Sequence, residues 1–144
     1  MITHDQLLDM WQQDVEIDKH QLDTESLNIP KLHHKYLCML MDIKSKKIAY
    51  SHKLEDIKKE KELYYSGQAT AAAYKEKPFD LKLKTKAGIE KHVNTDKEVV
   101  GLLQKLEYME ILVEGVNHIL ENIKWRNQNI KSALDWVKFQ SGEL

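Results

Sequence analysis

The last third of the chain carries apolar side chains at alternating steps of three and four residues. This spacing keeps one stripe of a helix facing a partner helix, which is typical of a coiled coil. The stripe consists of Val99, Leu102, Leu106, Met109, Val113, Val116, Leu120, Ile123, Asn127, Ile130, Leu134 and Val137. Four further apolar positions widen it beyond the narrow seam of a two-stranded coil: Leu103, Leu112, Ile119 and Ala133. The pattern therefore predicts a long C-terminal helix that assembles into a larger bundle.

We expect the contacts between copies to come from nine residues of this stripe. They are Leu102, Leu106, Met109, Val113, Val116, Leu120, Ile123, Ile130 and Leu134. Asn127 is the polar exception, and it either fixes the register of the helices or lies at a local opening to solvent. Trp125 and Trp136 fall off the stripe and are expected to pack against the preceding long helix of the same or a neighbouring copy.

A second long helix is predicted from Pro30 to Ser66. Proline fits the first turn of a helix, no glycine interrupts the segment, and Gly67 is expected to end it. Its stripe reads His33, Tyr36, Leu40, Ile43, Lys47, Tyr50, Leu54, Ile57, Lys61 and Tyr64. Because a buried ammonium group is costly, we expect its two lysines to lie at a rim or in a wet groove.

Shorter patterns predict the remaining elements. Thr3 and Gln6 form a capping box for a first helix whose apolar face is Leu7, Leu8 and Trp11. The segment 14–18 alternates as an extended, acidic stretch, and the segment 68–77 is expected to be a loop.

From Pro78 to Lys86 apolar and mostly basic residues alternate, which predicts a strand with a basic face. A turn at 86–88 and a second strand from Ile89 to Val93 would complete a small β-hairpin. Thr95 with Glu98 is then expected to cap the terminal helix.

The net charge is only −1, but the charges are distributed unevenly along the chain. Residues 1–30 hold one lysine and seven acids, net −6, and residues 31–91 hold fifteen lysines and eight acids, net +7. Residues 92–144 hold six basic and eight acidic side chains, net −2. We divide the chain into an acidic N-terminal segment (1–29), a basic middle (30–93) and an oligomerisation helix (94–144). The basic middle favours a polyanionic partner.

The composition excludes several classes of protein. No apolar stretch is long enough to cross a membrane, and the acids near the N-terminus do not fit a signal peptide. The only cysteine, Cys38, is expected to be a small core residue in a reducing cytoplasm. The sequence has no glycine-rich phosphate loop, no zinc-binding pattern and no recognisable nucleophile and base. We therefore expect a protein without enzymatic activity, cofactor or metal.

The lysines of the basic middle are candidate contacts to nucleic acid. They recur along the distal half of the predicted helix with tyrosines between them, and lysines neutralise phosphates while tyrosine rings can stack on unpaired bases. The candidate residues are Lys47, Lys58, Lys59, Lys61, Tyr64, Tyr65, Lys82, Lys84 and Lys86. A solvated helix with interspersed acids, such as Glu55 and Glu62, is the competing interpretation.

Three segments in a fixed order resemble the UvsY-type recombination mediators of T-even-like phages. An Asp-Val-x-Ile-Asp segment (14–18) precedes a basic helix that ends in Leu-Tyr-Tyr-Ser-Gly (63–67), and Thr-Asp-Lys-Glu-Val (95–99) opens the C-terminal helix. In that family a Lys-x-Arg motif just before the tyrosines is implicated in DNA binding. The matching positions here are Lys59, Glu60 and Lys61, so lysine replaces arginine and the planar guanidinium is lost.

The resemblance implies a mainly α-helical protein that forms a closed ring of about six or seven copies held by the C-terminal helices. It implies a non-enzymatic mediator that binds single-stranded DNA and loads a RecA-like phage recombinase onto strands coated by single-strand-binding protein, in the host cytoplasm. Either the turn at 59–61 or the strand lysines at 82–86 could dominate DNA binding. The acidic segment 14–18 would face a protein partner or repel DNA. The alternative function is a coiled-coil scaffold protein without DNA binding.

Overall fold

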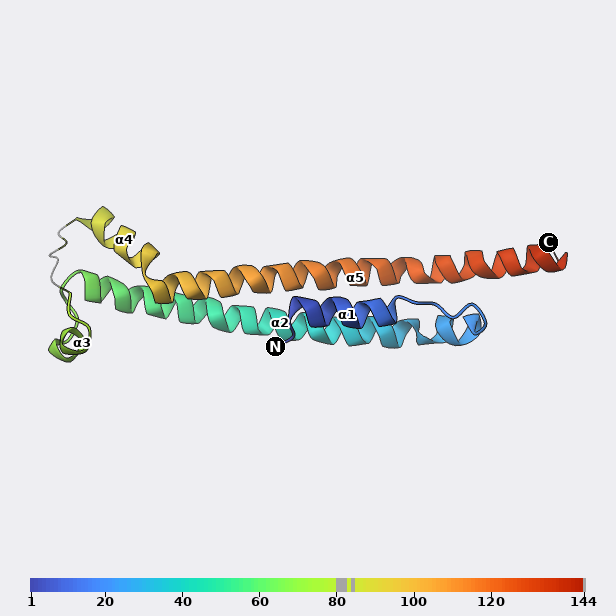
Figure 1. Ribbon diagram of the computed structural model, residues 1–144, viewed down its shortest axis with the longest axis horizontal. Coiled ribbons are helices and arrows are strands. Elements are labelled where there is room, and N and C mark those ends of the chain that lie inside the picture. The colour runs from blue at the N-terminus through green and yellow to red at the C-terminus, as the bar shows by residue number, and fades with distance from the viewer. Residues whose placement is uncertain (80–82, 84, 144) are drawn as a thin grey trace. The chain divides into compact units, whose positions relative to one another are not determined.

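The structure of the protein is a computed structural model that describes residues 1–79, 83 and 85–143. The described residues form five helices, α1 (His4–Asp14), α2 (Leu22–Tyr65), α3 (Ala71–Glu76), α4 (Lys86–Thr95) and α5 (Lys97–Ser141) (Figure 1). They include no strand. The prediction of a mainly helical protein with two long helices is confirmed. The chain divides into two compact units, residues 1–44 with 110–144 and residues 45–109.

In the first unit, α1 lies beside the N-terminal half of α2 (Figure 1). The predicted capping box is present, because the Thr3 hydroxyl accepts from the Gln6 amide and the Gln6 side chain accepts from the Thr3 amide. Leu7 is buried, and the Trp11 ring meets the Tyr36 ring edge to face at 5.6 Å. The prediction that Leu8 belongs to the buried face is wrong, since its side chain is exposed.

The connection between α1 and α2 is held by Arg126, the buried charged residue of the described core. Its guanidinium donates to the carbonyls of Val15 and Glu16 and to the Glu25 carboxylate at 2.8–3.1 Å. One planar group thus ties the linker and the start of α2 to α5.

Asp14, at the end of α1, accepts from the Lys35 ammonium at 2.6 Å and the Tyr36 hydroxyl at 2.8 Å. Partial burial alone would raise the pKa of this carboxyl. The two hydrogen bonds and the Lys35 charge outweigh burial and lower the pKa. In turn, burial and the bond to Asp14 raise the pKa of the Tyr36 hydroxyl. The segment 14–18, predicted to be extended, thus begins with the last residue of α1. Its other residues form a turn and coil.

Helix α2 begins eight residues before the predicted start, so Pro30 lies inside it. Asp23 and Glu25 favour the earlier start, because acids in the first turn complement the helix dipole. Proline removes the hydrogen bond of its missing N–H and crowds the carbonyl four residues before it, yet α2 continues through Pro30. The predicted end is confirmed: Gly67 has φ +81°, and the Gln68 amide donates back to the Leu63 carbonyl at 2.9 Å. Cys38 is exposed, so its prediction as a core residue is wrong; its Sγ lies 3.3 Å from Nε2 of His34.

The second unit has a core of Leu54 on α2, Val93 on α4 and Val99 on α5. Partly buried neighbours surround these three side chains: Ile57, Tyr65, Ile89, Leu102, Leu103 and Leu106. The predicted loop at 68–77 contains α3, whose run of three alanines favours a helix.

The predicted β-hairpin is wrong. Its second strand lies within α4, and Thr85 caps this helix by accepting from the Gly88 amide at 3.1 Å. Ile89 and Val93 share one face of a helix as well as one face of a strand, so their spacing did not decide between the two structures. Of the predicted first strand, residues 80–82 and 84 lie outside the described residues.

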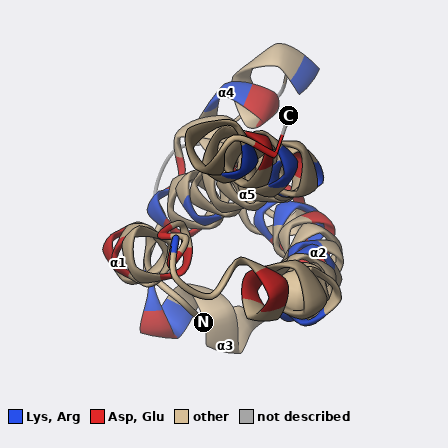
Figure 2. Ribbon diagram, turned by 90° about the vertical axis from the view of Figure 1, so that its right-hand side faces the viewer, with Lys and Arg blue, Asp and Glu red and all other residues tan. Residues whose placement is uncertain are grey.

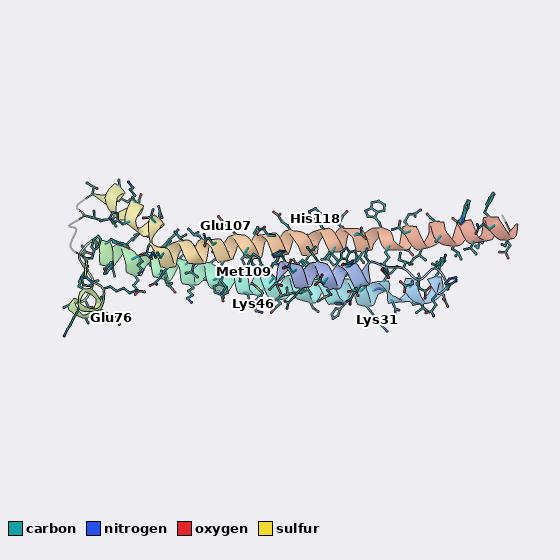
Figure 3. The ribbon with its side chains drawn as sticks, viewed as in Figure 1. Lys31, Lys46, Glu76, Glu107, Met109 and His118 are labelled. Carbon is teal, nitrogen blue, oxygen red and sulfur yellow. The ribbon has the colours of Figure 1, made fainter. Side chains whose placement is uncertain are left out.

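Helix α5 is capped one residue later than predicted, at Asp96 and not at Thr95. Thr95 belongs to α4 and donates to the Lys91 carbonyl, whereas the Asp96 carboxylate accepts from the Glu98 amide at 2.9 Å. Met109 lies on the side of α5 that faces α2 and is buried, while Glu107 lies on the opposite side (Figure 3).

Candidate nucleic-acid interface

The tyrosines at the end of α2 belong to an aromatic cluster in the second unit. Tyr64 stacks on Tyr74 with ring centroids 5.2 Å apart, and Tyr65 meets Phe79 edge to face at 5.0 Å. His92 on α4 adds an edge contact to Tyr65 at 5.5 Å. These rings fix the segment after α2 against the helix ends.

Hydrogen bonds of the hydroxyl groups reinforce this cluster. Tyr64 donates to the Lys77 carbonyl at 2.6 Å, and Tyr74 donates to the Tyr64 carbonyl at 2.6 Å. Tyr65 donates to the Asp96 carboxylate at 2.6 Å. Both candidate tyrosines, Tyr64 and Tyr65, are therefore half-buried parts of the packing, and their stacking on bases stays a prediction.

Lys61 lies in the same network. Its ammonium group is 3.5 Å from the Asp96 carboxylate and 3.4 Å from the Glu98 carboxylate, and only 12% of its side chain is exposed. Burial alone would raise the pKa of Asp96, but the bonds from Tyr65 and the Glu98 amide, together with the Lys61 charge, lower it. Burial first, and then the bond to Asp96, raises the pKa of the Tyr65 hydroxyl.

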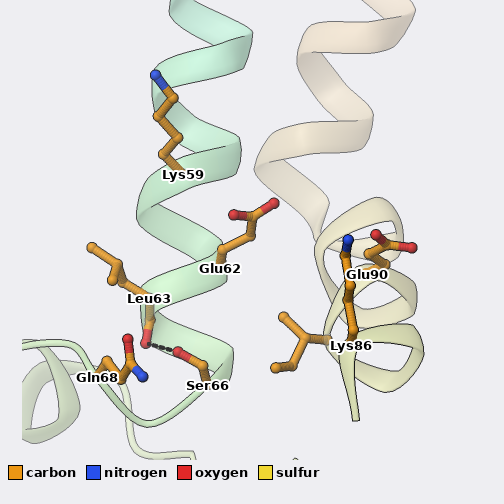
Figure 4. A pocket seen from close by; sticks show the side chains of 8 residues that line it. Lys59, Glu62, Leu63, Ser66, Gln68, Lys86 and Glu90 are labelled. Atoms are coloured by element: carbon orange, nitrogen blue, oxygen red, sulfur yellow. Dashed lines mark hydrogen bonds between the residues drawn. The ribbon is translucent and has the colours of Figure 1, made fainter.

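A pocket of about 620 Å³ lies between the last turns of α2 and the start of α4 (Figure 4). Its lining combines two lysines, two glutamates, two aliphatic side chains and two neutral polar ones. These residues are Lys59, Glu62, Leu63, Ser66, Gln68, Lys86, Ile89 and Glu90. Leu63 is exposed, so the pocket offers an apolar surface beside the side chains of two lysines. A nucleotide has a flat apolar base and a negative phosphate, which could contact such a surface and such lysines.

The structure separates the candidate lysines into groups. Lys59 and Lys86 are exposed and line this pocket, Lys47 and Lys58 are half-buried, and Lys61 is paired with carboxylates. Lys82 and Lys84 lie outside the described residues. Helix α2 carries both lysines and acids, and α1 carries acids (blue and red in Figure 2).

The structure also places the candidate oligomerisation residues. Met109, Val113, Val116, Ile123 and Ile130 are buried by the chain's own residues. Leu102, Leu106 and Leu120 are half-buried. Beyond Ile130 the apolar side chains of α5 are exposed: Leu134, Trp136, Val137 and Phe139. Trp125 is also exposed, so within the described chain neither it nor Trp136 is buried against the preceding helix.

Sequence analysis named only Lys59 and Lys86 of this pocket as candidate contacts, and it missed the other six lining residues: Glu62, Leu63, Ser66, Gln68, Ile89 and Glu90. Two of them sit on α4, which was predicted as a strand. The signal that could have placed them is Thr85, a good N-cap residue three positions before Gly88.

The fold and the pocket define a class: a small helical protein built on two long helices, with a pocket lined by two lysines and two glutamates at the end of the first of them. The family described as recombination, repair and ssDNA binding protein UvsY matches residues 10–143, and the chain therefore belongs to the UvsY family. Among the curated proteins, no match to this chain was found.

Solved structures of a phage protein share the fold. A crystal structure of the bacteriophage T4 recombination mediator protein UvsY (lattice type II) is 25% identical, with a TM-score of 0.83, over 98% of this chain and 99% of that chain. Lattice type I of the same protein is 26% identical, with a TM-score of 0.81, over 93% and 98%. Lattice type IV is 24% identical, with a TM-score of 0.82, over 96% and 99%. The described helices include none with the length and apolar character that a bilayer crossing requires.

Proposed function

We propose that this protein is a recombination mediator that binds single-stranded DNA as a homo-oligomeric ring. It would help to load a RecA-like phage recombinase onto strands coated by single-strand-binding protein in the host cytoplasm, without enzymatic activity of its own. The observation that carries the proposal is the pocket flanked by Lys59 and Lys86 in a chain of the UvsY family.

Phosphates of the strand would contact the two ammonium groups, and one base would rest on Leu63. Glu62 and Glu90 line the same pocket and oppose the negative charge, so each protomer binds weakly. A ring repeats the pocket around its axis, and linked weak contacts add up to a strong one. Bending a strand around the ring would weaken the hold of a coating protein and expose DNA to the recombinase.

Assembly would use the part of α5 beyond Ile130, because most of the seam predicted from the sequence is already buried within the chain. The four exposed apolar residues there need cover, and Trp136 and Phe139 already stack on each other at 5.6 Å. Packed against the same helix end of other copies, they would be removed from water.

The test is fluorescence anisotropy with a labelled oligothymidylate and a duplex of the same length. We expect a preference for the single strand and a steep loss of affinity with salt. The double variant Lys59→Gln with Lys86→Gln is expected to weaken binding about tenfold at low salt. Glu62→Gln is expected to strengthen binding, because it removes an opposing charge.

Lys31→Gln is the matched control, since Lys31 is an exposed lysine of α2 that belongs to the first unit and does not line the pocket. Oligomers that bind neither DNA form would favour a coiled-coil scaffold instead. Tighter binding to duplex would indicate an architectural protein for double-stranded DNA.

A further inference from the structure

A lysine of the C-terminal helix is fixed on the basic part of α2. The Lys105 ammonium donates to the Tyr50 hydroxyl at 2.7 Å and lies 4.1 Å from the centroid of the Tyr50 ring. The ring and the hydroxyl thus hold the end of a side chain that would otherwise be free to rotate. Both residues belong to the second unit.

Two lysines of α2 lie near the same ring. Lys46 precedes Tyr50 by one turn and Lys53 follows it by three residues, so the three side chains share one face of the helix. The hydrogen bond and charge of Lys105, with smaller effects of Lys53 and Lys46, lower the pKa of the Tyr50 hydroxyl. Asp56 is an exposed acid one turn beyond Lys53, where an ion pair at the surface contributes little. Three cations, Lys46, Lys53 and Lys105, therefore lie near Tyr50, and Asp42 lies one turn before Lys46.

This face is distinct from the pocket between α2 and α4. Nine residues separate Tyr50 from Lys59, and a helix turns about 100° per residue, so the two side chains point half a turn apart. Their separation along the axis is about 13 Å. The side chains of Tyr50 and Lys59 therefore lie on opposite sides of α2.

We propose that Lys53 and Lys105, with Tyr50 as the anchor of Lys105, form a second contact site for the phosphate backbone of single-stranded DNA. This inference rests on the proposed function. Because the site is built from the ammonium groups of Lys53 and Lys105, it recognises the charge of the backbone. Holding Lys105 in place lowers the entropy cost of each phosphate contact. A strand that engages both sites must pass around α2, which lengthens the footprint on each protomer.

The experiment measures anisotropy of labelled oligothymidylates of about 6 and about 30 nucleotides at several salt concentrations. The variants are Lys105→Gln and Lys53→Gln, with Lys97→Gln as the control, because Lys97 is an exposed lysine at the start of the same helix. Circular dichroism confirms that each variant is folded. For the long oligonucleotide, we expect Lys105→Gln to weaken binding about 3- to 10-fold and to reduce the salt slope by about 0.7, the value of one phosphate contact on a single strand.

Combination with Lys59→Gln separates the two sites. Since they are far apart, the losses are expected to multiply for the long oligonucleotide. Acetylation of lysines followed by mass spectrometry gives a second measurement without substitution. Bound DNA is expected to protect Lys53 and Lys105 and to leave Lys97 reactive.

Three outcomes would overturn the site. Wild-type affinity and salt slope in both Lys105→Gln and Lys53→Gln, with loss in Lys59→Gln, would refute it and leave the proposed function intact. An equal loss of affinity in Lys97→Gln would show that the losses come from the lower net charge and not from a specific site. Loss of binding to a labelled glutamate-rich peptide, but not to DNA, would assign the face to an acidic protein. A wild-type protein that binds no single strand would refute the proposed function itself.

Discussion

Nζ of Lys61 lies 3.5 Å from Oδ2 of Asp96, with 12% and 9% of the two side chains exposed. The contact joins the last turns of α2 to the residue that caps α5. Lys61 belongs to the turn at 59–61 that was expected to contact DNA, yet its ammonium group is paired with carboxylates within the chain.

Replacing Lys61 with methionine is therefore expected to act mainly on stability. The substitution leaves Asp96 partly buried without its cation, which costs about 2 kcal/mol of unfolding free energy. Urea unfolding followed by circular dichroism measures the change, and Lys59→Met, at an exposed position, is expected to stay within about 0.5 kcal/mol of the wild type. A Lys61→Met protein of unchanged stability that has lost its affinity for single-stranded DNA would return Lys61 to the binding surface.

Acid is expected to destabilise the second unit through Asp96. Its folded pKa lies below the unfolded value of 3.8, so the unfolded chain binds more protons as pH falls through that value. The stabilisation is complete well above pH 3.8 and is lost as pH falls through the folded pKa. Urea unfolding between pH 7 and pH 3 is expected to show a shallower decline for Asp96→Asn. Some decline persists, because the pKa of Asp14 is lowered too. Asp9→Asn, at an exposed position, is the control; a wild-type slope in Asp96→Asn would contradict the assignment.

Arg126→Met is expected to release the linker between α1 and α2. The variant leaves two carbonyls and the Glu25 carboxylate without their donor, at a cost of about 3 kcal/mol. Limited proteolysis is expected to cut within 15–21 more rapidly. Arg126→Lys keeps the charge but loses the planar fork and is expected to be intermediate. Wild-type resistance in Arg126→Met would show that other contacts hold the linker.

Trp136→Ser with Phe139→Ser is expected to reduce the mass of the proposed oligomer without unfolding the chain. Both side chains are exposed, at 59% and 62%, so the chain's own packing does not depend on them. Sedimentation velocity gives the mass, and circular dichroism gives the helix content. Val116→Asp is a useful contrast, because Val116 is fully buried within the chain and its change is expected to lower stability as well. An unchanged mass in the double variant would move the interface elsewhere.

Gly101→Ala is expected to stabilise the protein by about 0.5–1 kcal/mol. Gly101 lies inside α5, nothing approaches within 4 Å of an added Cβ, and alanine favours a helix more than glycine does. Gly115 in the same helix is the matched control, since its Cβ would lie 3.3 Å from Cδ2 of Leu7. Thermal melts are expected to show a smaller gain for Gly115→Ala. An equal gain at both positions would mean that the Leu7 side chain moves aside freely.

Sequence signals predicted the structure correctly where the interacting groups lie within a few residues of one another. The capping box at Thr3 and the helix end at Gly67 are both present, because each depends only on neighbouring backbone groups. Predictions failed where a distant partner decides the structure. The segment 86–95 became a helix whose Val93 joins the core with Leu54 and Val99, and its apolar spacing fitted a strand equally well.

The candidate site divides in the same way. The sequence by itself determined that the chain is built on two long helices, because the 3-4 apolar spacing is a local property of each segment. Neither Pro30 in α2 nor Gly101 and Gly115 in α5 ends its helix. The sequence also showed that most lysines lie in the middle of the chain. Only the tertiary structure decided which lysines are exposed: Asp96 neutralises Lys61, whereas Lys59 and Lys86 flank a pocket and Lys105 reaches Tyr50 from α5. Tertiary structure likewise decided that much of the apolar stripe of α5 is covered within the chain and that its end is not. The periodicity shows that one face of a helix is apolar. Which segment packs against that face depends on how segments far apart in the sequence come together.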